Sequence, residues 1–277
     1  MKDLLLSLAH DCFTYMNPAL ANQAEFQQSL DTVIKVKAGD NVQFSFDVKL
    51  DKLIKDKLSS HSMRIFSEES GWFSTVETYD YICVYDPFCN SSLASRTFRE
   101  AAMGISVFKA DYSWVASLVL DYQTGLVGLA DEQGFSTYLA QNGASIAPKS
   151  KTAASINDAW VVMTLENRQE RIGMATYFPL LQKIGRLVVS SGHIYWLKLA
   201  TGQIDAYLDP VGGEKLYEMF AATLVQKAGG VVTDTKGTPF DAGAMLKQFI
   251  ADGEYIYHPV AARTKSLHHE LLQVTAH

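Results

Sequence analysis

The chain has 277 residues, near the upper limit for one hydrophobic core, so we expect a single domain over residues 1–277 with two lobes, about 1–150 and 151–277. Hydrophobic residues make up 48% of the chain and charged residues 19%, which excludes a largely disordered protein. A net charge of −6 without any run of Lys or Arg excludes a surface built to bind nucleic acid.

The cysteines and the N-terminal sequence indicate the compartment. Cys12, Cys83 and Cys89 are odd in number and lack the spacing of metal ligands, so we expect a reducing, cytoplasmic compartment. The early leucine run is too short for a signal peptide, and no apolar run is long enough to span a membrane. We therefore expect no contact with membranes, a core position for Cys83 and an inert thiol at Cys89.

Helical and strand patterns alternate along the chain, which is typical of a mixed α/β fold. Helices are predicted over residues 3–16, on to about 30 after a break at Asn17-Pro18, and over 45–58, 168–183, 193–200 and 215–227. Strands are predicted over residues 63–66, 81–85, 105–108, 114–120, 126–130, 137–139, 160–163, 186–190 and 231–233. The strands between residues 104 and 146 are expected to form an antiparallel meander. Gly229-Gly230 is expected to cap the C-terminal end of the helix predicted over residues 215–227.

Acidic residues directly follow two of the predicted strands, Glu68 after residues 63–66 and Asp86 after residues 81–85. Glu68 and its neighbour Glu69 alone would be more typical of a solvated turn, but their position before Asp86 favours a site. Carboxylates at the ends of neighbouring strands can converge on Mg²⁺, which prefers oxygen ligands. If the Asn90-Ser91-Ser92 run opens a helix, its backbone N–H groups would bind a phosphate beside that metal.

Several segments resemble elements of the inositol monophosphatase family, a group of metal-dependent, lithium-sensitive sugar phosphatases related to fructose-1,6-bisphosphatase. Residues 68–70 resemble its Gly-Glu-Glu-Ser element and residues 86–92 its Asp-Pro-Ile-Asp-Gly-Thr-Thr element. Residues 200–207 resemble its Ala-x-Gly-x-x-Asp-Ala-Tyr element, and residues 228–234 its Ala-Gly-Gly element. With Asp47, these matches follow the family's order over almost the whole chain. The resemblance, to a divergent member, implies a five-layer αβαβα sandwich that is often dimeric.

The resemblance also implies an activity and a set of site residues. The activity is hydrolysis of a small sugar or inositol phosphomonoester by metal-activated water, with Mg²⁺ or Mn²⁺ as cofactor and with inhibition by lithium. The implied partners are a small phosphorylated metabolite and a second copy of the chain. The implied residues are the catalytic Asp47, Ser91 and Glu68, the metal-binding Glu68, Asp86, Phe88 (through its carbonyl) and Glu218, and the substrate-binding Asn90, Ser91, Ser92, His193 and Asp205.

The chain departs from the family pattern at one metal site. Cys89 stands at the second aspartate of the Asp-Pro element and Asn90 at the glycine, and a thiolate is a poor ligand for Mg²⁺. Near the late metal-binding acid, ungapped counting gives Tyr217, whereas a one-residue shift gives Glu218. Two hypotheses therefore stand: an active phosphatase with one firmly held metal, or a degenerate, catalytically weak or inactive member that binds a phosphate ligand or a protein.

Two further positions, His193 and Asp205, keep alternatives open. His193 stands where the family has a small hydroxyl residue beside the substrate, so it either alters specificity or fills the pocket. Asp205 either contacts the substrate or pairs with nearby backbone groups. His268 and His269 are expected on a solvated helix face.

Overall fold

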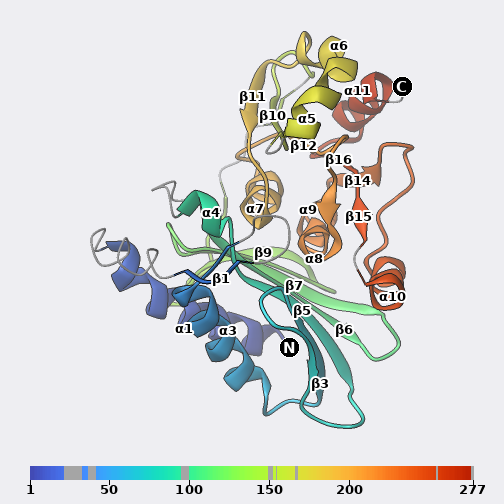
Figure 1. Ribbon diagram of the computed structural model, residues 1–277. Helices are drawn as coiled ribbons and strands as arrows, with labels where there is room; N and C mark the ends of the chain where they lie inside the picture. The colour runs from blue at the N-terminus through green and yellow to red at the C-terminus, as the bar shows by residue number, and fades with distance from the viewer. Residues whose placement is uncertain are drawn as a thin grey trace. The chain divides into compact units, whose positions relative to one another are not determined.

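The computed structural model describes residues 1–21, 33–36, 42–94, 100–148, 152–153, 155–165, 168–253 and 255–275. The chain forms two compact units, one of residues 1–132 and 136–146 and the other of residues 133–135 and 147–277. Each unit contains helices and sheet (Figure 1), which confirms the predicted mixed α/β class. That the two units make one domain stays a prediction. Among the described helices, none has both the length and the hydropathy that crossing a bilayer requires.

The first unit is built on a seven-stranded sheet in the order β4-β3-β5-β6-β7-β8-β9. Its strands are β3 (Met63–Ser67), β4 (Gly71–Ser74), β5 (Tyr81–Cys89), β6 (Ala102–Lys109), β7 (Trp114–Asp121), β8 (Leu126–Asp131) and β9 (Gly134–Leu139). β3 and β5 run parallel, whereas β5 to β8 pair antiparallel in sequence, as the predicted meander requires. The parallel pair is the part of this sheet that positions the site.

Helices cover one face of this sheet. α1 (Lys2–Ala21) contacts β7 and β8, and α3 (Ser45–Leu58) contacts β5. The short pair β1 (Val33–Val36) and β2 (Val42–Phe44) precedes α3, and α4 (Ser91–Ala94) follows β5. Along β3 the alternate residues Met63, Ile65 and Ser67 are buried, as expected for a strand with one face on a core. Ser67 therefore lies on the same face of the sheet as the core residue Ile65.

The predicted end of the first helix at Asn17-Pro18 is wrong, because α1 runs through Pro18 to Ala21. Proline fixes its own φ near the helical value and removes a single N–H donor, so a helix can continue through it close to its end. The further helical stretch predicted to about residue 30 lies outside the described residues.

The second unit is built on a five-stranded sheet in the order β11-β10-β12-β16-β14. The strands are β10 (Trp160–Met163), β11 (Arg186–Val189), β12 (Ala206–Leu208), β14 (Val231–Asp234) and β16 (Pro259–Ala262). β10, β11 and β12 are parallel, and β16 pairs antiparallel with β12 and β14. The predicted strands 160–163, 186–190 and 231–233 are confirmed.

Helices cover both faces of this second sheet. Ala206 and Leu208 face a core shared with Leu267 and Leu271 of α11 (Lys265–Thr275). The intervening Tyr207 packs its ring 4.7 Å from that of Trp196 in α7 (His193–Thr201). The remaining elements of this unit are α5 (Arg168–Gly173), η1 (Met174–Tyr177), α6 (Phe178–Leu181), β13 (Glu214–Lys215), α8 (Leu216–Met219), α9 (Ala222–Lys227), α10 (Ala242–Asp252) and β15 (Ile256–Tyr257).

Two helices predicted as continuous are interrupted. The stretch 168–183 divides into α5, η1 and α6, and at the junction of η1 and α6 Pro179 has no N–H to continue the preceding turn. The stretch 215–227 divides into α8 and α9, where the Thr223 hydroxyl donates to the Phe220 carbonyl at 2.8 Å. A side chain that binds a nearby carbonyl in this way competes with the helical pattern.

The predicted glycine cap after α9 is confirmed. Gly229 has a φ of 91°, and the N–H groups of Gly229 and Gly230 donate to the carbonyls of Gln226 and Val225 at 3.1 and 2.9 Å. This pair of bonds satisfies carbonyls that the helix end leaves without helical partners. Because the pair follows a helix, its role is structural.

The expectation of a solvated face at both His268 and His269 is wrong for His268. Its side chain is buried, and Nε2 lies 3.0 Å from the Thr233 hydroxyl of β14, whereas His269 is exposed. Neighbouring residues point in different directions on a helix, so the two histidines cannot share one face. Burial lowers the pKa of His268 below its ordinary value.

We predict that acidification below about pH 6.5, the ordinary pKa of histidine, destabilises the protein partly through His268. The folded state depresses this pKa, so the stabilisation is complete above that pH and is lost as the pH falls, since the unfolded chain binds the proton more readily. His268→Gln should make urea unfolding less sensitive to pH between about pH 5 and about pH 8. His269→Gln, at the exposed neighbour, is the control. A wild-type pH dependence in His268→Gln would contradict the prediction.

Candidate active site

Glu68 and Asp86 lie at the carboxyl ends of the parallel strands β3 and β5. The strand register places Ser67 opposite Tyr85, so the two acidic residues follow side by side. The Glu68 N–H donates to the Tyr85 carbonyl at 3.0 Å, which extends the pairing by one residue. Glu68 is half-buried and Asp86 is 5% exposed. The two carboxylates thus share one edge of the sheet, partly shielded from water.

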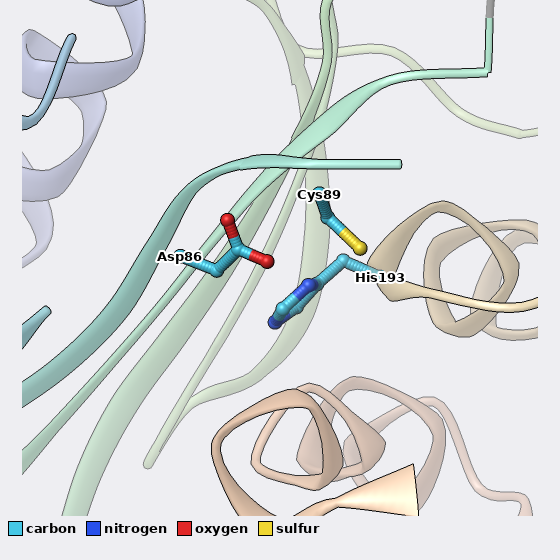
Figure 2. A group of neighbouring side chains, drawn as sticks. All are labelled: Asp86, Cys89 and His193. Atoms are coloured by element: carbon cyan, nitrogen blue, oxygen red, sulfur yellow. The ribbon is translucent and has the colours of Figure 1, made fainter. Parts of the chain in front are cut away.

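A β-bulge shapes the strand at Asp86. Asp86 pairs with Gly104 and Cys89 with Ala102, so two residues of β5 oppose a single residue of β6. The Asp86 Oδ1 accepts the Phe88 N–H at 2.9 Å, and the Pro87 carbonyl accepts the Tyr122 hydroxyl at 2.8 Å. A proline is well placed in a bulge, because it has no N–H to give to the ladder. Asp86 and Cys89 both project from this strand (Figure 2).

Three packed aromatic side chains connect the beginning of α3 with this bulge. The Phe46 ring meets the Phe88 ring edge-on at 4.5 Å, and the Phe88 ring stacks on Tyr122 at 5.2 Å. Burial raises the pKa of Tyr122 well above its usual value, and the neighbouring Cys12, Asp86 and Asp47 raise it further. Asp47, buried in the first turn of α3, therefore belongs to the same electrostatic environment as Asp86.

Asn90 takes the backbone conformation that a glycine would favour. Its φ is 68°, in the left-handed region, and its Nδ2 donates to the Glu100 carbonyl at 3.0 Å. Asparagine tolerates this conformation better than most residues, so the loop keeps its form without the family's glycine. The half-buried Ser91 then opens α4, and the side chain of Ser92 lies outside the described part.

Asp51, which the sequence pattern did not single out, is a further part of this region. It lies one helical turn after Asp47 and is 6% exposed. Its Oδ1 accepts the Tyr85 hydroxyl at 2.6 Å and the Ser67 hydroxyl, and its Oδ2 pairs with Lys55 at 2.8 Å. The signal in the sequence was its position on the buried stripe of α3, where an acidic residue needs partners.

Two carboxylates of the first unit are of the donor type that a hard divalent cation prefers. Glu68 and Asp86 offer carboxylate oxygens at neighbouring strand ends, which suits Mg²⁺ or Mn²⁺. Cys89 is buried and forms no disulfide, so it offers sulfur where the family pattern has a carboxylate. A second Mg²⁺ at that position does not fit this side chain.

The remaining predicted site residues lie in the second unit. His193 is the first residue of α7, and burial lowers its pKa to about 4, although a backbone hydrogen bond with Tyr217 opposes this. The Asp205 oxygens accept the N–H groups of Ala153 and Trp160 at 2.9 and 3.0 Å. These partners lie 52 and 45 residues away in the sequence, so the observed bonds are not local ones, and contact of Asp205 with substrate stays a prediction. Glu218 lies in α8, half-buried, and its role as a metal ligand also stays a prediction.

The chain is similar in structure to several solved proteins. It matches the extragenic suppressor protein suhB of Bartonella henselae with a TM-score of 0.77 and 14% identity, covering 99% of this chain and 97% of that chain. An IMPase of Thermotoga maritima matches with a TM-score of 0.74 and 15% identity, covering 99% and 96%. An inositol monophosphatase of Zymomonas mobilis matches with a TM-score of 0.69 and 16% identity, covering 100% and 98%. The chain has the inositol monophosphatase fold.

No protein-family model matches the sequence, and a search of curated proteins also finds no match. The similarity is therefore one of fold, at 14–16% sequence identity. Where the resembling sequence element has a glycine, Asn90 adopts a positive φ of 68°.

We predict that Asn90→Ala destabilises the protein more than Asn90→Gly does. Both variants lose the hydrogen bond to the Glu100 carbonyl, but only alanine also holds a strained positive φ, at a cost of about 1–2 kcal/mol. Urea unfolding of the two variants beside the wild type measures the difference. Equal midpoints for the alanine and glycine variants would show that the loop does not require this conformation.

Proposed function

We propose that the protein is a divergent phosphatase of the inositol monophosphatase family, which uses Mg²⁺ or Mn²⁺ to hydrolyse a small sugar or inositol phosphomonoester. The observation that carries the proposal is the side-by-side position of Glu68 and Asp86 at the ends of β3 and β5. Residues 68 and 86 follow the paired Ser67 and Tyr85, so both acidic side chains start from the same edge of the sheet. Bringing two carboxylates together costs free energy unless a cation or protons neutralise them, so a bound divalent cation would explain the pair.

Glu68, Asp86 and the Phe88 carbonyl would hold the cation. The bond from the Phe88 N–H to Asp86 Oδ1 turns the bulge so that its backbone and the carboxylate are fixed together. When bound, a divalent cation polarises phosphoryl oxygens and lowers the pKa of its water. The remaining steps concern the chain's own residues.

Asp47 and Ser91 would orient the attacking water, and Asp47 would accept its proton. The packing of Phe46 on Phe88 supports this role, because it keeps the first turn of α3 against the bulge that holds Asp86. The backbone N–H groups of residues 90–92 would donate to phosphate oxygens. His193 would be neutral near pH 7, since burial lowers its pKa to about 4, so it would act on specificity by shape and hydrogen bonding and would not pair with phosphate charge.

The second candidate function is a degenerate member that binds a phosphate ligand or a protein without turnover. The observation that favours it is Cys89, which offers a thiol at the position of a metal-binding carboxylate. We rank it second, because Asp47 and Asp86 are buried and Glu68 is half-buried, and carboxylates withdrawn from water are costly without a cation or hydrogen-bond donors to offset their charge.

The enzyme proposal predicts Mg²⁺-dependent release of phosphate from at least one compound in a panel of inositol, fructose and nucleotide monophosphates, and inhibition by lithium. Asp86→Asn should lower kcat/KM by at least about 100-fold, because it removes a negative ligand but keeps the side chain's shape. A colorimetric phosphate assay over a range of Mg²⁺ concentrations measures both. The enzyme proposal fails if turnover by the wild type does not exceed that of Asp86→Asn on any compound.

Cys89→Asp separates the two candidate functions further. An added carboxylate supplies the oxygen ligand that the thiol does not, so we expect a several-fold higher rate or metal affinity in a one-metal enzyme. Cys89→Ser, which offers a neutral oxygen of similar size, is the matched control. If Cys89→Asp increases neither the rate nor the metal affinity, the idea that a second-metal ligand is missing at this position is contradicted.

A further inference from the structure

We propose that Asp51 is a positioning residue that holds the two metal-binding strand ends in register, an inference that rests on the proposed function. Ser67 and Tyr85, whose hydroxyls it accepts, directly precede Glu68 and Asp86. One carboxylate on α3 thus ties together the two residues that lead into the predicted metal ligands. No pattern in the resemblance assigns Asp51 a role.

The bonds to Asp51 leave it suited to positioning and not to coordination. Oδ1 receives the Tyr85 hydroxyl at 2.6 Å and the Ser67 hydroxyl, and Oδ2 pairs with Lys55 at 2.8 Å. A carboxylate this deeply buried is stable only when such donors offset its desolvation. Hydrogen bonds to an ionised acceptor are stronger than neutral ones, so the ties to both strands are firm.

The Ser67 hydroxyl connects Asp51 with the backbone next to Glu68. While it donates to Asp51, its oxygen accepts the Glu69 N–H at 3.2 Å. On the other side, the Glu68 N–H donates to the Tyr85 carbonyl at 3.0 Å. The backbone before and after the Glu68 side chain is therefore held by two bonds, and one of them runs through the Ser67 hydroxyl that donates to Asp51.

The hydrogen bond from the Tyr85 hydroxyl to Asp51 constrains the neighbouring strand β5 in a similar way. The Tyr85 side chain is buried, and its hydroxyl donates to Asp51 Oδ1 at 2.6 Å. Because Asp86 begins the bulge directly after Tyr85, a fixed Tyr85 side chain also fixes where the bulge starts.

The test compares Asp51→Asn and Tyr85→Phe with the wild type in three measurements. NMR hydrogen exchange should become faster at the Glu68 and Glu69 amides and stay unchanged in the middle of β3 and β5. Mn²⁺ titration by calorimetry should give a Kd about 10-fold weaker, the usual effect of losing a residue that orients a ligand. The Mg²⁺ concentration for half-maximal activity should rise in parallel, with the KM for substrate unchanged.

Two controls separate positioning from general destabilisation. Asp56 of α3 pairs with Lys52 four residues away, as Asp51 pairs with Lys55, but the Asp56 pair is exposed. Asp56→Asn should therefore change none of the three quantities. Ile65→Val trims the buried core of β3 and should lower the unfolding temperature without altering Mn²⁺ affinity. Tyr85→Phe removes a single hydroxyl, so it remains informative if Asp51→Asn does not fold.

Three outcomes decide the inference. Wild-type exchange at the Glu68 and Glu69 amides in both variants overturns it. Faster exchange with unchanged Mn²⁺ affinity also overturns it, since Asp51 would then be structural only. If the wild type binds no Mn²⁺ at all, the proposed function fails, and exchange alone decides whether Asp51 holds the two strand ends.

Discussion

Two strands that run side by side in the same direction end at the same edge of their sheet, and β3 and β5 are such a pair. Their register, with Ser67 opposite Tyr85, carries Glu68 and Asp86 to neighbouring positions without any long-range contact between the carboxylates themselves. A slip of one residue in this register would turn the side chains of one strand to the other face. The core residues Ile65 and Cys83, which are directly opposite each other and fully buried, hold the register against such a slip.

The bulge and the packed aromatic side chains adapt this simple pairing to a site. Pro87 interrupts the ladder to β6 where it can do so without losing a donor, and Tyr122 satisfies its carbonyl. Phe46 and Phe88 then join α3 to the same point, which brings Asp47 into the environment of Asp86. Where the sequence departs from the family pattern, the fold shows how the departure is accommodated: Asn90 adopts the positive φ, and Cys89 is buried as a thiol.

The sequence predicted the features that depend on local patterns. The strands around Met63 and Tyr81 and the position of Asp47 near a helix start follow from periodicity and turn residues, and all three are confirmed. Asp51 was not predicted, because a helical pattern shows that a position is buried but not which distant hydroxyl groups will donate hydrogen bonds to it. His268 was misassigned for the same reason, since its partner Thr233 lies 35 residues away. The breaks near Pro179 and Thr223 depend on single side chains that an amphipathic pattern overlooks.

The central claim is that Glu68 and Asp86 together bind one divalent cation. Crystals soaked in Mn²⁺ and measured at the manganese absorption edge test it directly, because an anomalous peak locates the ion independently of any assumed ligand. We predict a peak within about 2.0–2.3 Å of an oxygen of each carboxylate. No peak between Glu68 and Asp86 at saturating Mn²⁺, in crystals that retain the pairing of β3 with β5, would contradict the claim.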